Sequence, residues 1–412
     1  MKPNQEIRSK QDLLNHFGSS QQLEILNLKQ IENLLEMNVQ PKIWEDASNR
    51  NLLSFSQQFV LQTKRFGFNN GEIEYIYLIS FFTYLTELSL YDNQISDISA
   101  ISKLKSLQKL DLSSNRIEDI SAIQSLLDLT HLDLSKNKLT IYTLALPNLK
   151  YLSLGYNKLI DKSGLQHSPI LEILDLYQTN TTDLRTIPHQ LFGLKDLTLS
   201  ENNLTEISNL SNFVALQKLD LGYNDLLQNI QSIKFCTQLT FLSFRATNVV
   251  DIWPLQFLKN LKTLYMTYTQ VIDLHPLQYL YKLEGIYTPY TCIIDVSPLS
   301  KLTQLNYLNF RKNKTTNAET LKHHKNFSKY DFSDQDVPTT DELKFYNKIL
   351  SVHSSHKQIQ KLIQAENRAS KFRESMTHQK ESIKLKINEQ IQVINMKIEI
   401  WAQFIQNFNA DQ

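Results

Sequence analysis

The sequence has little glycine and almost no cysteine, with 8 glycines and 2 cysteines among 412 residues. Scarce glycine argues against a glycine-rich nucleotide-binding loop. Cys236 and Cys292 cannot build a disulfide framework, which favours a reducing compartment. The chain also has no Cys-x-x-Cys and no His-Glu-x-x-His motif. We therefore predict a cytoplasmic protein with no metal and no cofactor.

An excess of charge and a long apolar run are also missing. Lys and Arg number 43 and Asp and Glu 42, so the formal net charge is +1. This balance argues against a generally basic nucleic-acid binder. The longest apolar stretch, Tyr75 to Leu85, is shorter than the roughly 20 residues of a membrane helix. The first residues lack the apolar core of a secretory signal, so we expect neither nucleic acid nor membrane as a partner.

A strong internal repeat is present instead. The frame Leu-x-x-Leu-x-Leu-x-x-Asn recurs at intervals of 20 to 23 residues, most often 22. Thr replaces the final Asn in some copies, and Ile, Phe, Met or Thr replaces a Leu at position 4 or 6 in the last four. Such self-similarity predicts a solenoid, in which each repeat stacks on its neighbours. The frame starts at residues 85, 107, 129, 149, 171, 194, 216, 239, 261, 283 and 305.

The spacing within one repeat predicts its shape. Positions 4 and 6 of the frame, such as Leu88 and Leu90, point inward from a short strand. Later apolar positions, such as Ile95, Ile98 and Ile101, recur every three residues, the period of a 3-10 turn. The Asn or Thr at position 9 can satisfy backbone groups inside the turn. We predict a curved α/β solenoid, with a parallel β-sheet on its concave face and short 3-10 or irregular turns on its convex face.

The repeats have predicted boundaries. A divergent first coil over 63–84 places apolar residues at most inward positions, and the repeat domain covers 63–326. Residues 1–62 have two amphipathic patterns and are predicted to form a helical N-terminal cap. We expect a linker over 327–338 and a helical tail over 339–412. An apolar seam from Ile387 to Phe408 fits either a helical hairpin or an intermolecular coiled coil.

The second half of several repeats has a specific form. It reads Asp-x-x-Pro-Leu at Asp251–Leu255, Asp273–Leu277 and Asp295–Leu299. These repeats resemble the 22-residue leucine-rich repeats of bacterial internalins and of the leucine-rich regulatory subunit of protein phosphatase-1. The resemblance covers about residues 63–326 and implies a curved leucine-rich-repeat array that binds proteins.

Tyrosine is concentrated at the outward positions of the predicted strands. Positions 3, 5, 7 and 8 of eleven repeats hold ten of the 18 tyrosines, although an even spread over 412 residues would place about two there. Tyrosine buries much area at low entropic cost, so it is favoured at protein interfaces. We predict that a partner protein binds this concave face through Tyr91, Tyr151, Tyr156, Tyr177, Tyr223, Tyr265, Tyr268, Tyr287, Tyr290, Tyr307 and Phe241.

Charged residues follow the same face. Asp111, Asp133, Asp175 and Asp220 occupy position 5 in the first part of the array. Arg245, Arg311 and Lys312 occur later, among the aromatic residues. A partner with a basic segment and an apolar or acidic segment would match this distribution. The alternative is that the aspartates only keep the face soluble.

A catalytic alternative is weak. His131, Asp133 and Ser135 alternate along one predicted strand, but residues two apart on a strand lie about 7 Å apart, too far for a nucleophilic triad. We therefore predict a non-catalytic adaptor or regulatory scaffold, whose tail over 339–412 mediates self-association or binds a second protein. The alternatives are a regulatory subunit of a phosphatase-1-like enzyme, and an internalin-like adhesin exported without a signal peptide.

Overall fold

The computed structural model describes residues 64–67, 69, 73–76, 79–80, 82–336, 338, 340, 343–344 and 347. The chain divides into two compact units, Met1–Gln335 and Asp336–Gln412. The predicted cap over 1–62 lies outside the described residues, as does nearly all of the predicted tail over 339–412. Among the described residues, no helix is long and apolar enough to cross a bilayer.

The first unit contains a parallel sheet of 12 strands in chain order. From β2 onward, each strand occupies positions 3 to 5 of one predicted repeat, so the predicted frame is confirmed. A strand also occurs in the divergent first coil, where β1 pairs with β2 in register. The strands are β1 (Arg65–Gly67), β2 (Glu87–Ser89), β3 (Lys109–Asp111), β4 (His131–Asp133), β5 (Tyr151–Ser153), β6 (Ile173–Asp175), β7 (Asp196–Thr198), β8 (Lys218–Asp220), β9 (Phe241–Ser243), β10 (Thr263–Tyr265), β11 (Gly285–Tyr287) and β12 (Tyr307–Asn309).

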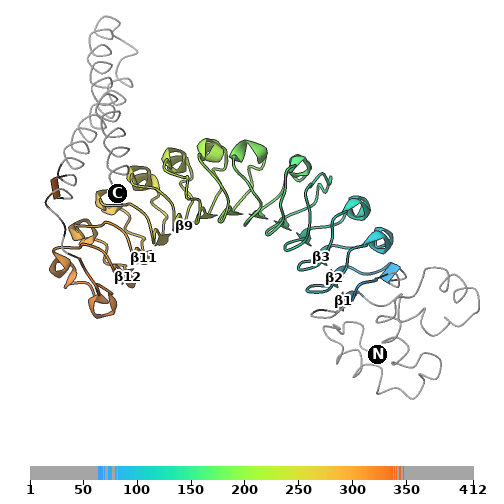
Figure 1. Cartoon of the computed structure of the whole chain (residues 1–412), viewed down its shortest axis with the longest axis horizontal. Helices are drawn as coiled ribbons and strands as arrows, with labels where there is room; N and C mark the ends of the chain where they lie inside the picture. Colours follow the sequence, from blue (N-terminus) through green and yellow to red (C-terminus); the bar gives the residue numbers. More distant parts are fainter. Residues whose placement is uncertain are drawn as a thin grey trace, which may run out of the picture. The chain divides into compact units, whose positions relative to one another are not determined.

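Short 3-10 helices form the other side of the coils (Figure 1). Within residues 82–336 no α-helix occurs, in agreement with the three-residue apolar period. An aspartate often starts the turn: the backbone N–H of Ser99 donates to Asp97 Oδ1. The helices are η2 (Ser99–Lys103), η3 (Ser121–Ser125), η4 (Ser163–His167), η5 (Leu184–Thr186), η6 (Ser208–Asn212), η7 (Gln231–Phe235), η8 (Trp253–Phe257), η9 (His275–Leu277), η10 (Ser297–Leu299), η11 (Ala318–Leu321) and η12 (Phe327–Lys329).

The core is continuous between the strands and the 3-10 helices. Leu88, Leu110 and Leu132 are buried at position 4 of successive coils and are register partners across β2, β3 and β4. One coil cannot cover its own leucines, so each depends on the coils beside it. Figure 1 shows the strands on the inner, concave side of the curved array.

Buried asparagines at position 9 join consecutive coils. Asn115 Nδ2 donates to the Leu112 carbonyl of its own coil at 3.0 Å and to the Leu90 carbonyl of the preceding coil at 2.9 Å. Its Oδ1 accepts from the Ile95 N–H of the preceding coil at 3.0 Å. We call this set the amide link. A corresponding link is made by Asn137, Asn157, Asn202, Asn224 and Asn313.

A threonine at position 9 makes only some of the hydrogen bonds of the amide link. The hydroxyl of Thr269, for example, donates to the Met266 carbonyl of its own coil at 2.8 Å. In the described residues no hydrogen bond from these threonines reaches the preceding coil, so four junctions between coils lack the amide link. The threonines are Thr179, Thr247, Thr269 and Thr291.

The predicted linker over 327–338 needs correction, because residues 327–335 form a further coil. Tyr330 is buried, and Phe332 stacks on Phe310 of the preceding coil with ring centroids 5.5 Å apart. Gln335 stands where the other coils have Asn and donates to the Phe310 carbonyl at 2.6 Å. The Asp331 N–H donates to the Leu308 carbonyl at 2.9 Å, which continues the backbone ladder. Aromatic residues and glutamine thus replace leucine and asparagine, and they cover the last leucine layer.

Removal of inward leucines should destabilise the array. We expect Leu132→Ala and Leu219→Ala, both fully buried, to lower the free energy of unfolding by about 2–5 kcal/mol each, because each leaves a cavity. The matched control is Leu127→Ala, whose side chain is 53% exposed and should cost little. Urea unfolding measures all three, and equal losses would contradict the assigned frame.

Candidate binding surface on the strand face

The outward positions 3, 5, 7 and 8 of the coils form one surface, which we call the strand face. Tyr151, Phe241 and Tyr307 begin β5, β9 and β12, while Tyr265 and Tyr287 end β10 and β11. Because neighbouring strands lie about 4.8 Å apart, side chains at equal positions form rows across the sheet. The predicted aspartates end β3, β4, β6 and β8, and the other predicted residues follow the strands directly.

Four aromatic side chains over the last strands form a continuous group. Phe241 and Tyr265 have ring centroids 5.6 Å apart, Tyr265 and Tyr287 4.1 Å, and Tyr287 and Tyr307 4.4 Å. Gly285 leaves room for this group, since a Cβ there would lie 3.3 Å from Tyr287 Cε2. Burial is the main cause that raises the pKa of Tyr287 to about 12. We call Phe241, Tyr265, Tyr287 and Tyr307 the aromatic platform.

A second set of tyrosines occupies position 8. Tyr268 and Tyr290 stack with centroids 4.6 Å apart, and Tyr156 lies 4.7 Å from Tyr177. Tyr223 lies under the Arg245 guanidinium at 5.1 Å. Position 8 has a left-handed backbone in every coil from Asp92 to Asp334, with φ between 50° and 59°: Asp92, Ser114, Lys136, Tyr156, Gln178, Glu201, Tyr223, Ala246, Tyr268, Tyr290, Lys312 and Asp334.

Two predicted tyrosines lie apart from these groups. Tyr91 is exposed, and its backbone N–H donates to Asn69 Oδ1 at 3.0 Å. Tyr151 on β5 stacks loosely with His131, with centroids 6.0 Å apart. The sequence therefore placed all ten tyrosines on one face, whereas the structure joins most of them into contacting sets.

The four predicted aspartates, which we call the acidic row, have a local structural role. The first carboxylate oxygen of each accepts the backbone N–H two residues later, as Asp133 does from Ser135 at 2.9 Å. In the described residues none of the four has an ion-pair partner. The position-3 carboxylates differ, since Glu87 pairs with Arg65 at 3.2 Å and Lys109 at 3.1 Å. The acidic row consists of Asp111, Asp133, Asp175 and Asp220.

Electrostatic coupling is visible within the acidic row. Burial is the largest cause that raises the pKa of Asp133, hydrogen bonds from Ser135 oppose it, and the charges of Asp111 and Asp175 raise it further. The pKa of Tyr151 is raised to about 12 by burial and by the charges of Asp133 and Asp175. Asp133 and Tyr151 therefore both lie in the field of neighbouring carboxylates of the row.

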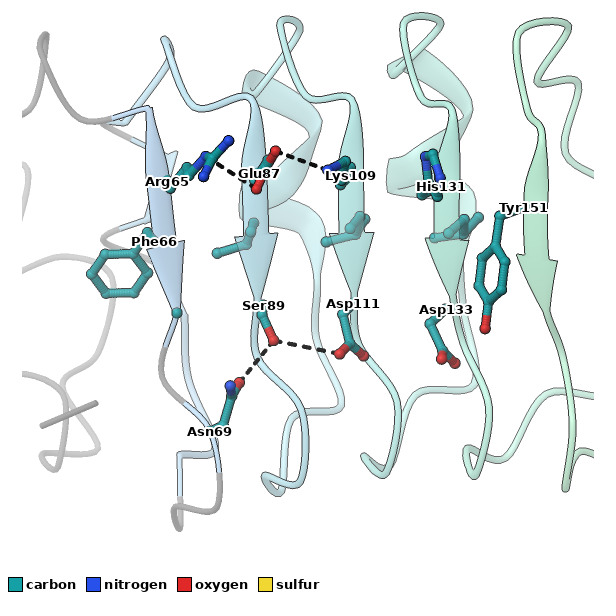
Figure 2. Close-up of a pocket in the computed structure, with 14 residues that line it drawn as sticks. Arg65, Phe66, Asn69, Glu87, Ser89, Lys109, Asp111, His131, Asp133 and Tyr151 are labelled. Atoms are coloured by element: carbon teal, nitrogen blue, oxygen red, sulfur yellow. Dashed lines mark hydrogen bonds and ion pairs between the residues drawn. The ribbon is translucent and has the colours of Figure 1, made fainter. Parts of the chain in front are cut away.

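A shallow hollow of about 430 Å³ lies over the first strands of this face (Figure 2). Figure 2 shows Glu87 between Arg65 and Lys109 on one side, and Ser89 between Asn69 and Asp111 on the other. Asp133 and Tyr151 border the hollow at its far end. Polar and charged side chains therefore surround this end of the strand face.

The predicted basic residues have different surroundings. Arg311 Nε donates to Asp334 Oδ2 of the last coil at 2.9 Å. Lys312 is exposed beside it. Arg245 has no ion pair among the described residues and lies over Tyr223. Gly222 makes room for it, because a Cβ there would lie 2.9 Å from Arg245 Cγ.

His131, Asp133 and Ser135, the residues of the catalytic alternative, do not form a hydrogen-bonded proton relay. The Ser135 hydroxyl donates to Asp133 Oδ1 at 2.7 Å. His131 Nδ1 instead lies 2.8 Å from Thr130 Oγ1. Across the described part of the chain, no three His, Cys, Asp or Glu side chains are grouped as metal ligands.

Every junction that lacks an amide link has a ring contact on the strand face, although rings also meet at two linked junctions, in the pairs His131–Tyr151 and Tyr287–Tyr307. Each coil with Thr at position 9 contacts the preceding coil through a ring on the strand face. The pairs are Tyr156–Tyr177 before Thr179, Tyr223–Arg245 before Thr247, Phe241–Tyr265 before Thr269, and Tyr265–Tyr287 with Tyr268–Tyr290 before Thr291. Part of the ring packing therefore stabilises the array itself.

Comparison with known proteins agrees with this architecture. The family model "Leucine Rich repeats (2 copies)" matches residues 85–125, and the model "Leucine Rich repeat" matches residues 145–166. The chain is a leucine-rich-repeat protein. A search of curated proteins gives no match.

Several solved structures have the same fold. Internalin InlF of Listeria monocytogenes is 24% identical, with a TM-score of 0.57 over 68% of this chain and 89% of that chain. The functional domain of InlJ of the same species is 21% identical, with a TM-score of 0.53 over 66% of this chain and 63% of that chain. A leucine-rich-repeat protein of Leptospira interrogans is 21% identical, with a TM-score of 0.51 over 68% and 86%. At these identities the likeness shows the fold.

Neutralisation of one carboxylate should change the pH dependence of stability. Because the pKa of Asp133 is raised in the folded protein, its ionised form costs stability as the pH rises through that pKa. We expect Asp133→Asn, which can keep the acceptor for Ser135, to melt above the wild type at neutral pH. The difference should vanish below about pH 3.9, where the wild-type carboxyl is protonated in both states.

The control variant should change the stability at neutral pH in the opposite direction. A backbone hydrogen bond from Ser121 is the main cause that lowers the pKa of Asp119, so its stabilising contribution is lost as the pH falls through that pKa. Asp119→Asn should therefore melt below the wild type at neutral pH. Thermal unfolding over a pH series measures both variants, and the same pH response in both would refute the raised pKa of Asp133.

The stabilising role of ring contacts at junctions without an amide link is also testable. Phe241→Ala should lower the free energy of unfolding by about 0.5–1.5 kcal/mol beyond the lost area, because its ring pair with Tyr265 is lost. Thr269→Asn should restore part of this loss by forming an amide link at the same junction. Urea unfolding of the single and double variants measures the compensation, and further destabilisation by Thr269→Asn would contradict it.

Proposed function

We propose that this protein is a non-catalytic adaptor that holds a partner protein on the strand face. Leucine-rich-repeat solenoids are protein-interaction scaffolds, because stacked coils create an extended concave surface. Here that surface has exposed tyrosines, which offer large contact area and a hydroxyl while losing few rotamers. The aromatic platform and the tyrosines at position 8 are the proposed contact residues.

One observation supports this proposal most directly. Tyr156, Tyr223, Tyr268 and Tyr290 are between 43% and 56% exposed, and each has φ between 55° and 59°. Sheet propensity does not explain these residues, because they lie beyond the strands. A left-handed backbone also favours glycine or asparagine over a bulky side chain, so local structure does not select tyrosine there.

The ring contacts across junctions give tyrosine a second role, and a test must separate the two. A tyrosine removed from the aromatic platform takes its stacking contacts with it, so reduced capture could follow from a weaker fold. Tyr268 and Tyr290 are better targets, because their loss leaves the Tyr265–Tyr287 contact at the same junction and asparagine is well tolerated in the left-handed region. The chain itself has Asn180 and Asn317 in that conformation.

The experiment compares partner capture by two double variants in quantitative pull-downs from the native cells. We expect Tyr268→Asn with Tyr290→Asn to lose captured protein, because central aromatic contacts are commonly worth about 2 kcal/mol or more each. The thermal midpoint should fall only slightly, because Tyr265–Tyr287 still joins the two coils after the Tyr268–Tyr290 contact is lost.

The matched control is Tyr279→Asn with Tyr281→Asn. These tyrosines are also exposed, at 43% and 54%, but they lie between η9 and β11, outside the strand face. The control should capture the same proteins as the wild type. If both variants, or neither, lose the captured proteins, the strand face is not the binding surface.

A further inference from the structure

The strand face has two regions of opposite charge. From β2 to β8 its outward positions hold eight carboxylates and three lysines: Glu87, Asp92, Asp111, Asp133, Asp175, Asp196, Glu201 and Asp220, against Lys109, Lys136 and Lys218. From β9 to β12 the same positions hold no carboxylate and three cations, Arg245, Arg311 and Lys312. The change of sign occurs between β8 and β9.

In the first region, the acidic row has charge available for a partner. Glu87 and Asp196 at position 3 already pair with lysines, at 3.1 Å to Lys109 and 3.5 Å to Lys218. The acidic row has no such partners among the described residues, although its side chains are half-buried. A cation from outside would form charge-assisted hydrogen bonds there and relieve the repulsion between neighbouring aspartates.

In the second region, the aromatic platform presents a different chemistry. Stacking at 4.1 Å and 4.4 Å covers the ring faces of Tyr287, so ring edges and hydroxyl groups are left for contact. This surface suits apolar side chains and hydrogen-bond acceptors. Arg245, fixed over Tyr223 at 5.1 Å, adds a cation without an acidic partner among the described residues. A second lysine or arginine would be repelled here.

We infer that the partner presents two separate chemical groups in a fixed order along the array. Lysine or arginine side chains lie over the acidic row between β3 and β8, and apolar or acidic side chains lie over the aromatic platform between β9 and β12. This inference rests on the proposed function. At about 4.8 Å per strand step, the basic group covers about 24 Å and the apolar group about 14 Å.

The test selects a displayed library of random peptides on the full-length protein. We expect enriched peptides to contain a cluster of Lys or Arg and a separate cluster of apolar residues. The best peptide is then synthesised with a control of equal composition, in which the basic and apolar residues alternate. The control should bind about tenfold more weakly, because it cannot place both clusters at once. Enrichment of peptides that lack a basic cluster, or no enrichment, overturns the inference.

Two variants then assign the groups to their regions. The first changes Asp111, Asp133, Asp175 and Asp220 to Asn, which keeps the turn because Asn309 already accepts the Arg311 N–H in the equivalent position at 3.1 Å. It should weaken the selected peptide about tenfold and abolish most of the salt dependence. The second, Tyr287→Ala with Tyr307→Ala, is assayed below its own thermal midpoint, since both rings also join coils; it should weaken binding about as much and leave the salt dependence intact.

The outcomes separate this inference from the proposed function. If the Asn variant binds the selected peptide like the wild type, or the salt response is unchanged, the inferred partner chemistry is wrong. The proposed function stands in that case, provided that Tyr268→Asn with Tyr290→Asn still loses the captured proteins. If that double variant also captures normally, the proposed function itself fails.

Discussion

The buried amide at position 9 is the interaction on which the array depends. Each strand ends in a sharp turn whose backbone groups face the interior, where water cannot satisfy them. One asparagine bonds its own coil and the coil before it, so a single side chain both closes the turn and sets the stacking. Since this stacking aligns equal positions in rows, the acidic row and the aromatic platform are consequences of the turn.

Most of the fold could be predicted because leucine spacing encodes it directly. An inward side chain at positions 4 and 6 needs a strand, and a three-residue apolar period needs a 3-10 turn. The last coil was missed because Phe327, Tyr330 and Phe332 replace its leucines and Gln335 replaces asparagine. A signal was present in the 22-residue step from Leu305 to Phe327, where large apolar residues keep the frame.

The sequence predicted which residues form the candidate surface, but it did not predict how these residues contact one another. Alternation along a strand shows which residues face outward, so the spacing alone assigned the ten tyrosines and four aspartates to the outward face. The left-handed backbone at position 8 has no sequence signature here, since residues as different as Ser114, Lys136 and Tyr156 occupy it. The turn-capping role of the aspartates could have been suspected, because aspartate often accepts a backbone N–H two residues later.

The threonine junctions make the side-chain hydrogen bonding between coils uneven along the array. Between the coils that start at 216, 239, 261 and 283, three successive junctions have no amide link and are held on the strand face by rings. Together with the junction before Thr179, this segment therefore has fewer hydrogen bonds between coils than the parts of the array joined by asparagine. A partner that contacts those rings would therefore contact the same side chains that join these coils to one another.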